Sequence, residues 1–395
     1  MSSQDEGEIY LDHHATTPVD DRVVEAMEPI LTKDFGNPAS NNNHRAGDTA
    51  NGHVKQSRKQ LLSAFNATRT EEIIFTSGAT ESDNLALKGT MRYARKEGEG
   101  NHLIVGATEH DAIIDTAEIL SQEGFEVTII PVDEYGQVDP DDVREAIHND
   151  TVLVSLMAAN NEVGTIAPLK EIGELTSEED ILFHTDAVQA VGYVDLDVEE
   201  LEIDMMSISG HKIYGPKGVG ALYVRYGSTY LEPLVHGGGH ERGWRSGTLN
   251  TPGIVGLSKA IELAEASKKS RSDRIKQLRD RLWEGIESQL DDVLLNGHPD
   301  KRLPNNLNVS FLGVDNQRLV GRLSNNGLYA ATGSACSTME TQESHVLTAM
   351  FSDDKRIQSA IRFGLGKDIT EEDIDEAIEI VVENVQRLRK FNDML

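Results

Sequence analysis

The sequence has few of the features that mark membrane and secreted proteins. It has one cysteine, Cys336, among 395 residues, so no disulfide can form within the chain. No run of about 18 apolar residues occurs, which excludes a transmembrane helix, and we expect no membrane partner. The amino terminus, MSSQDEGEIYLD, is acidic and lacks the apolar core of a secretory signal. These absences favour a protein of a reducing cytoplasm.

Positive charge is also scarce. Lys and Arg number 37 against 67 Asp and Glu, which gives a formal net charge of −30 at pH 7. Such a field repels nucleic acid and anionic membranes, so we expect no direct nucleic-acid partner. The acidic residues are spread along the chain, in stretches such as DPDDVRE and TEEDIDEAIE, and are not gathered into a tail. This distribution indicates a halophilic protein; a mildly acidic bacterial enzyme is the alternative.

The hydrophobic pattern predicts an α/β protein. Short apolar runs alternate with helical patterns up to about residue 255; the runs include EEIIFTS, NHLIVGA, TVLVSLM and ILFHTDA. Such alternation is typical of a mostly parallel sheet covered by helices. Beyond it, a long amphipathic helix leads into strands and further helices, ending in TEEDIDEAIEIVVENVQRLRKF. We expect this second part to be a smaller α+β domain.

The stretch TSGATESDN, residues 76–84, follows a predicted strand and opens a predicted helix. Backbone N–H groups at a helix N-terminus attract a phosphate, and Thr80 can add a hydroxyl donor. The alternative is an ordinary strand–helix turn with a serine or threonine cap. In SISGHKIYGPKG, residues 207–218, Lys212 follows a buried strand. Burial there would lower its pKa and free the amine for a Schiff base, whereas most lysines extend to the surface.

Two further stretches carry side chains that suit a flat heteroaromatic cofactor. Asp186 follows the apolar strand ILF and could pair with a protonated pyridine nitrogen, with Gln189 on the same side. The alternative is that Asp186 is the N-cap of a helix formed by DAVQAV. His110, at the start of another helix, could stack on a ring or move a proton, or could simply be a cap.

The glycine-rich stretch GGGHERGWRSGTLNTPG is either a binding segment or a flexible loop.

The order and spacing of these stretches resemble the pyridoxal-phosphate cysteine desulfurases of the NifS/IscS type, in the aminotransferase class V family. The resemblance runs from about residue 8 to 390, through motifs that include YLDHHATTPVD, FTSGATESDNLA, NNEVGTIAP, SGHKIYGPKGVG, GSACST and SAIRFGLG. It implies the fold-type I architecture and a homodimer. We expect an N-terminal segment, 1–17, that packs with the small domain. The expected large cofactor-binding domain is 18–258, and the small domain is 259–395.

The resemblance also implies a role for each matching residue. Lys212 should hold pyridoxal phosphate covalently, Asp186 should pair with its ring nitrogen, and His110 should stack on the ring and serve in catalysis. Gln189 should contact the ring hydroxyl. The phosphate should be held by Ala79, Thr80, Ser209 and His211, and by Thr248 from the other subunit. Asn161 is expected to contact both cofactor and substrate, and Arg362 to bind the substrate carboxylate, which its planar fork matches.

The same resemblance gives the lone cysteine a role. The Cys336 thiolate should attack the sulfur of L-cysteine, giving L-alanine and a persulfide on Cys336 that passes to an acceptor protein. The flanking small and polar residues suit a mobile, exposed thiol. The length of GSACSTMETQESHVLTAM matches the long-loop subgroup that serves general sulfur supply. An iron–sulfur scaffold is the expected acceptor, and Cys336 is then a possible transient ligand of its cluster; tRNA thiolation and DNA phosphorothioation are the other destinations.

Two alternatives stay open. The protein could be a selenocysteine lyase or another fold-type I pyridoxal-phosphate enzyme, although an aminotransferase has no need of Cys336. It could instead be a non-enzymatic sulfur-carrying scaffold, which the presence of the lysine, aspartate and arginine disfavours. His13, His14 and His240 depart from the usual family pattern, and the sequence assigns them no role.

Overall fold

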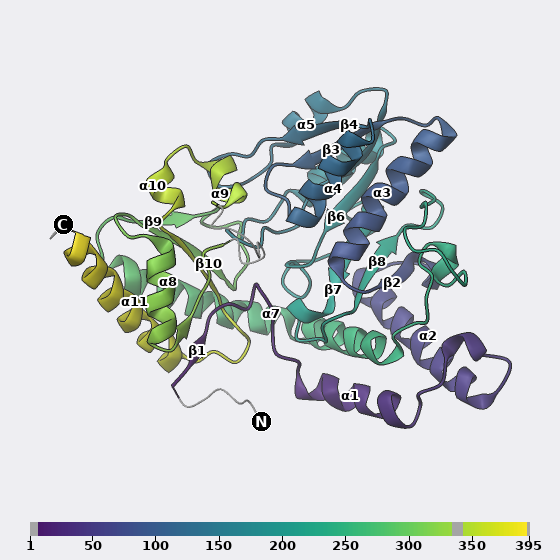
Figure 1. The fold of residues 1–395 in the computed structure, drawn as a ribbon, viewed down its shortest axis with the longest axis horizontal. Coiled ribbons are helices and arrows are strands. Elements are labelled where there is room, and N and C mark those ends of the chain that lie inside the picture. Colours follow the sequence, from purple (N-terminus) through teal and green to yellow (C-terminus); the bar gives the residue numbers. More distant parts are fainter. Residues whose placement is uncertain (1–6, 334–342, 393–395) are drawn as a thin grey trace.

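A sheet of seven strands forms the centre of the larger part of the molecule (Figure 1). The computed structural model describes residues 7–333 and 343–392. Across the sheet the strands lie in the order β2 (Ile73–Thr76), β8 (Gly220–Val224), β7 (Met205–Ser209), β6 (Leu182–Asp186), β5 (Thr151–Ser155), β3 (His102–Gly106) and β4 (Glu126–Ile130). Strands β3 to β7 pair in parallel, whereas β8 is antiparallel to both neighbours. The predicted α/β class with a mostly parallel sheet is confirmed.

Helices cover both faces of this sheet, which is why all its strands except the edge strand β4 are almost fully buried. Ile73 and Phe75 of β2 point into a core shared with helices on one face, and Ile74 points into a second core on the other. The first core takes in α2 (Arg45–Phe65) and α6 (Leu169–Glu178), and the second takes in α3 (Ala79–Glu97) and α4 (Asp111–Gln122). The remaining helices of this part are α1 (Asp21–Thr32) and α5 (Pro140–Ala146).

One helix, α7 (Thr251–Glu287), joins the two parts of the molecule. Its first half places Ile254 and Leu257 in a core of the large sheet, and its second half places Leu278 and Leu282 in the core of the smaller part. Asn250 caps its start by accepting a hydrogen bond from the Gly253 N–H at 3.1 Å. The boundary predicted between residues 258 and 259 falls inside this continuous helix, and the domain limits stay a prediction.

The smaller part is built on an antiparallel sheet. Its strands are β9 (Val293–Asn296), β10 (Asn306–Phe311) and β12 (Ala360–Gly364), in the order β12-β10-β9. Helices α8 (Asn316–Asn325) and α11 (Glu371–Asn392) complete its core together with α7. The short helices are α9 (His345–Met350) and α10 (Asp354–Ile357). None of the helices in the described ranges has the length and hydropathy needed to span a bilayer.

The N-terminal segment runs along the smaller part before the chain enters the larger one (Figure 1). Strand β1 (Ile9–Tyr10) pairs in parallel with β11 (Leu328–Tyr329), and Asp12 forms a bridge with Gly364 of β12. Thr17 then donates through its N–H and its hydroxyl to the carbonyl of His211, both at 3.0 Å. Residues 12–17 therefore lie between the two sheets, where a site formed by both parts would be.

Candidate active site

A cavity of about 530 Å³ opens at the carboxyl ends of the parallel strands, where open α/β sheets bind their ligands. Residues following β2, β3, β5, β6 and β7 line it, and the smaller part and the N-terminal segment close the other side. Among its lining residues are ten of those predicted from the sequence: Ala79, Thr80, His110, Asn161, Asp186, Gln189, Ser209, His211, Lys212 and Arg362. Positions almost 300 residues apart in the sequence thus meet at one place.

The start of α3 supplies one end of the cavity. Gly78 is the N-cap residue and provides no side-chain cap, so the alternative of a serine or threonine cap is wrong. Ser77, Gly78, Ala79 and Thr80 all line the cavity. An alanine at Gly220 of β8 would place its Cβ 2.8 Å from the backbone of Gly78, so the glycine lets this turn approach the sheet. An uncapped helix N-terminus lying against a cavity is suited to bind an anion.

Lys212 lies half-buried in the cavity, on a single 3₁₀ turn that follows β7. Its Nζ donates to the carbonyls of His14 at 2.6 Å and Ala15 at 2.8 Å. The neighbouring His211 is held by the Thr16 hydroxyl, 3.1 Å from Nδ1. Burial, with the positive charges of Lys212 and Lys217, lowers the pKa of His211 to about 4. His211 is therefore neutral at pH 7 and can act as a hydrogen-bond donor or acceptor but not as a charge.

Asp186 is the last residue of β6 and is 4% exposed. It accepts a hydrogen bond from the Val188 N–H at 2.9 Å. Burial raises its pKa above the usual range, and the charge of His110, the Val188 hydrogen bond and the charge of Lys212 offset part of that rise. His110 lines the same cavity and also caps α4, accepting from the Ala112 N–H at 3.0 Å, so the capping interpretation is confirmed and its role towards a ring stays a prediction.

The prediction of a helix after Asp186 is wrong. Residues 188–193 form turns, and the chain reaches β7 without a helix. The segment closes one turn through hydrogen bonds from Ala190 and Val191 to the carbonyl of Ala187, and then turns away at Gly192, whose φ is +77°. A side chain at Gly192 would meet Arg271 and Ala264 of α7, so packing against that helix ends the turn. The apolar DAVQAV pattern reflects burial here, since tertiary contacts override local propensity.

Arg362 lies in β12 and is 2% exposed. Its Nη2 donates to Asp12 Oδ1 at 2.9 Å, and its Nη1 donates to the carbonyls of Asn161 and Gly333, both at 3.2 Å. Within the described residues its buried Nε has no hydrogen-bond partner. Because an unpartnered buried donor is costly, this guanidinium beside a cavity is suited to an incoming carboxylate.

Two predicted residues are not seen in the cavity. Cys336 lies outside the described residues, although Gly333 and His345, on either side of that segment, both line the cavity. Thr248 is exposed and is not among the lining residues of this chain, so its contribution from another subunit stays a prediction.

The cavity also contains residues that the sequence did not identify. His14 donates from Nδ1 to Gln189 Oε1 at 2.8 Å, and the Gln189 amide donates back to the His14 carbonyl at 3.0 Å. Glu162 accepts a hydrogen bond from the Ser344 hydroxyl at 2.6 Å. Asp83, Lys217 and His345 are further lining residues with ionisable side chains that the sequence did not identify. The partners of His14 and Glu162 are 175 and 182 positions distant, so no local pattern could have indicated them.

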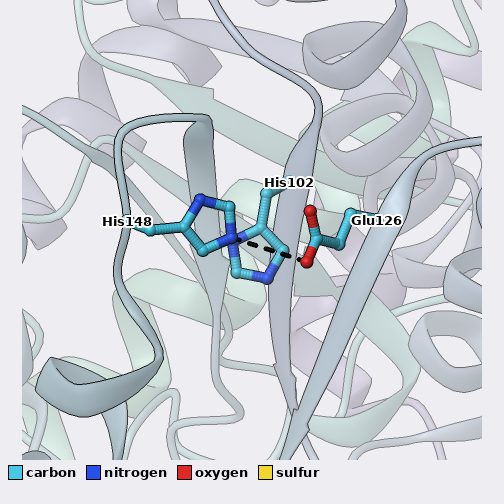
Figure 2. A group of neighbouring side chains, drawn as sticks. All are labelled: His102, Glu126 and His148. Atoms are coloured by element: carbon cyan, nitrogen blue, oxygen red, sulfur yellow. Dashed lines mark ion pairs between the residues drawn. The ribbon is translucent and has the colours of Figure 1, made fainter.

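A second group of histidine and carboxylate side chains lies at the opposite, amino-terminal ends of the strands (Figure 2). His102, Glu126 and His148 place ligand atoms within 4.8 Å of one another. The two imidazole rings are stacked, with centroids 4.2 Å apart and planes 14° apart. Both His102 nitrogens lie 2.8 Å from threonine hydroxyls. The lone pairs of stacked rings lie in nearly parallel planes and do not converge on one point, and both His102 nitrogens already have threonine partners, so this geometry is poorly suited to a tetrahedral metal site.

We expect the stability of the protein to depend on pH through His184, which is buried next to the cavity. Burial lowers its pKa to about 3, so in the folded protein it stays neutral where an unfolded histidine, with a pKa of about 6.5, binds a proton. The contribution of neutral His184 to the free energy of unfolding is fully present above pH 6.5 and is lost as the pH falls from there towards 3. We expect His184→Gln to reduce the slope of unfolding free energy against pH by up to about 1.4 kcal/mol per unit between pH 4.5 and 6.

Denaturant titration across this pH range measures the slope. The control is His236→Gln, at an exposed position, which should leave the slope unchanged. An identical slope for His184→Gln and the unaltered protein would contradict the neutral state of His184.

Comparison with known proteins relates the chain to a single family. The family model described as aminotransferase class-V matches residues 9–377. A protein named cysteine desulfurase IscS, from Methanosarcina thermophila, is 48% identical over 98% of this chain and 94% of its own length. A NifS-like protein of known structure superposes with a TM-score of 0.89 at 38% identity, covering 96% of this chain and all of the other. The structure titled SspA in complex with cysteine superposes with a TM-score of 0.78 at 37% sequence identity. The match covers 90% of this chain and 98% of the other chain.

Proposed function

This chain belongs to the aminotransferase class-V family and is a pyridoxal-phosphate-dependent cysteine desulfurase, and we propose that the cavity at the strand ends is where L-cysteine gives up its sulfur. The observation that carries the proposal is the meeting of Lys212, Asp186 and Arg362 in one cavity of about 530 Å³. These are an amine, a buried carboxylate and a buried guanidinium with a free donor.

The residues present fit pyridoxal phosphate. The uncapped N-terminus of α3, with Ala79, Thr80, Ser209 and His211, would hold its phosphate. Asp186 would pair with its ring nitrogen, Gln189 would contact its ring hydroxyl, and His110 would lie against the ring. Lys212 would bind it covalently through Nζ. The bound cofactor supplies an electron sink that stabilises negative charge at the substrate Cα.

The chain's own groups then divide the work. Arg362 and Asn161 would orient the substrate carboxylate, and the amine of Lys212, once free, would take the proton from the substrate Cα. The Cys336 thiolate would form an S–S bond with the substrate sulfur as the C–S bond breaks, and the electrons and a proton would go to carbon. L-Cysteine and the Cys336 thiol thus give L-alanine and a Cys336 persulfide, with all atoms accounted for.

The quaternary state and the acceptor are part of the same proposal. We expect a homodimer in which Thr248 of the partner subunit reaches the phosphate. The persulfide would pass to a sulfur-acceptor protein, most simply an iron–sulfur scaffold whose cluster Cys336 could bind transiently during transfer. The formal net charge of −30 argues against direct transfer to nucleic acid.

The test is to supply pyridoxal phosphate to the purified protein in high salt and to measure L-alanine formed from L-cysteine. Alanine formation with a visible absorption band is expected. Alanine formed from L-selenocysteine but not from L-cysteine would instead identify a selenocysteine lyase. A protein that binds no cofactor and forms no alanine would be a sulfur-carrying scaffold.

A further inference from the structure

We propose that Asp83 is a positioning residue for Asp186: a buried carboxylic acid that stays neutral and leaves Asp186 as the single negative charge facing the ring nitrogen of the cofactor. The inference rests on the proposed function, in which Asp186 makes that contact. It adds a residue that the sequence motifs do not identify and that lies on a different element.

Asp83 lies in the first turns of α3, is 1% exposed, and lines the cavity together with Asp186. Two strand residues locate it beside Asp186. Ser207 of β7, whose hydroxyl interacts with the Asp83 carboxyl, is the direct neighbour of Asp186 in the β6–β7 register. His184 precedes Asp186 by two positions on β6, and its Nε2 lies 3.8 Å from Asp83 Oδ1. Since side chains alternate along a strand, His184 and Asp186 share a face, and Asp83 packs against that face.

No positive charge accompanies Asp83. In the described part of the chain it forms no ion pair with a lysine or arginine, and its Oδ1 has no hydrogen-bond partner. Its histidine neighbour is neutral, because full burial of His184 disfavours the charged ring and lowers its pKa to about 3. The two ring nitrogens lie 2.8 Å from the Ser155 hydroxyl and 3.0 Å from the Ser207 hydroxyl. A third buried carboxyl, Glu109, also faces Asp186 and has an unpartnered Oε2. The immediate surroundings of Asp83 therefore hold other carboxyls, and the described residues place no lysine or arginine in an ion pair with it.

Two neighbouring carboxylates in such surroundings do not both ionise. The carboxyl that has hydrogen-bond donors and positive charges beside it ionises, and the other keeps its proton. Asp186 has the Val188 N–H at 2.9 Å and faces the charges of Lys212 and His110. Asp83 has none of these, and burial together with the negative charge of Asp186 raises its pKa well above the usual range. Asp83 therefore holds the proton and Asp186 the charge.

The infrared spectrum tests this assignment directly, because a protonated carboxyl has its own carbonyl band. The difference spectrum between the unaltered cofactor-free protein and Asp83→Asn at neutral pH should contain that band. The matched control is Asp115→Asn, an exposed aspartate on α4, whose difference spectrum should show only an ionised carboxylate. A carboxylate signal alone in the Asp83→Asn difference spectrum would overturn the proposal.

Cofactor affinity supplies a second readout. Asn has the shape and the neutrality of a protonated Asp, so Asp83→Asn should bind pyridoxal phosphate within about threefold of the unaltered protein. Asp83→Leu, which removes the polar group, should bind about tenfold more weakly. A loss in Asp83→Asn as large as that in Asp186→Asn would show that Asp83 is a second charge, and would overturn the proposal. Undiminished affinity in Asp186→Asn would instead contradict the proposed function of Asp186, whatever the infrared band of Asp83.

Discussion

Replacing Lys212 with alanine is expected to lower the rate of L-alanine formation from L-cysteine by at least about a thousandfold. In the proposed mechanism the variant would lose the covalent link to the cofactor and the base that moves the Cα proton. Both functions belong to one amine, which the structure holds in the cavity through the carbonyls of His14 and Ala15. The measurement is alanine release under saturating L-cysteine, with the visible spectrum recorded on the same samples.

Lys259→Ala is the control, since Lys259 lies on α7 and pairs with Glu262. It should match the unaltered enzyme in rate and spectrum. Lys212→Ala should still retain pyridoxal phosphate non-covalently, because the groups proposed for the phosphate and ring remain. A Lys212→Ala protein that keeps more than about a tenth of the rate would require another base and another covalent attachment.

Replacing Arg362 with leucine is expected to lower kcat/KM for L-cysteine by about a hundredfold, mainly through KM. The guanidinium is buried, is positioned by Asp12, and has an unpartnered Nε in the described structure. Cysteamine, which lacks the carboxylate, provides the internal comparison. Its kcat/KM should change by less than about threefold, so the variant should lose most of the preference for L-cysteine.

Arg362→Lys is the control for misfolding, because it keeps a positive charge beside Asp12. The kcat/KM of Arg362→Lys for L-cysteine should lie between those of the unaltered enzyme and Arg362→Leu, about tenfold below the unaltered enzyme. Lysine cannot form the planar two-point contact with a carboxylate. Equal losses of activity towards cysteamine and L-cysteine in Arg362→Leu would show that Arg362 supports the fold of the site and does not bind the carboxylate.

The sequence was informative where a residue's role depends on its own strand or helix. TSGATESDN and SISGHKIYGPKG each place a small or reactive residue just after an apolar strand, and parallel strands bring their carboxyl ends together. The structure accordingly has the N-terminus of α3 and Lys212 at one cavity. Their chemical roles are inferred from the family resemblance.

Contacts between distant segments could not be predicted. Asp83 belongs to the TESDN stretch, but its burial beside Asp186 depends on how α3 packs over β6 and β7. His14 and Gln189 bond across 175 positions. The turn after Asp186 was misjudged as a helix because the packing of Gly192 against α7 is invisible in a local pattern. Cys336, which the resemblance makes the acceptor of the substrate sulfur, lies outside the described residues.

The most direct test of the account is a single-turnover measurement of alanine and of persulfide on Cys336, with no reductant present. The cofactor-loaded enzyme should form the two in equal amounts from L-cysteine, and Cys336→Ser should form neither at a comparable rate. Alanine production by Cys336→Ser at the rate of the unaltered enzyme, with free sulfide as the second product, would contradict persulfide transfer. The protein would then be a lyase that releases sulfur directly from the cavity.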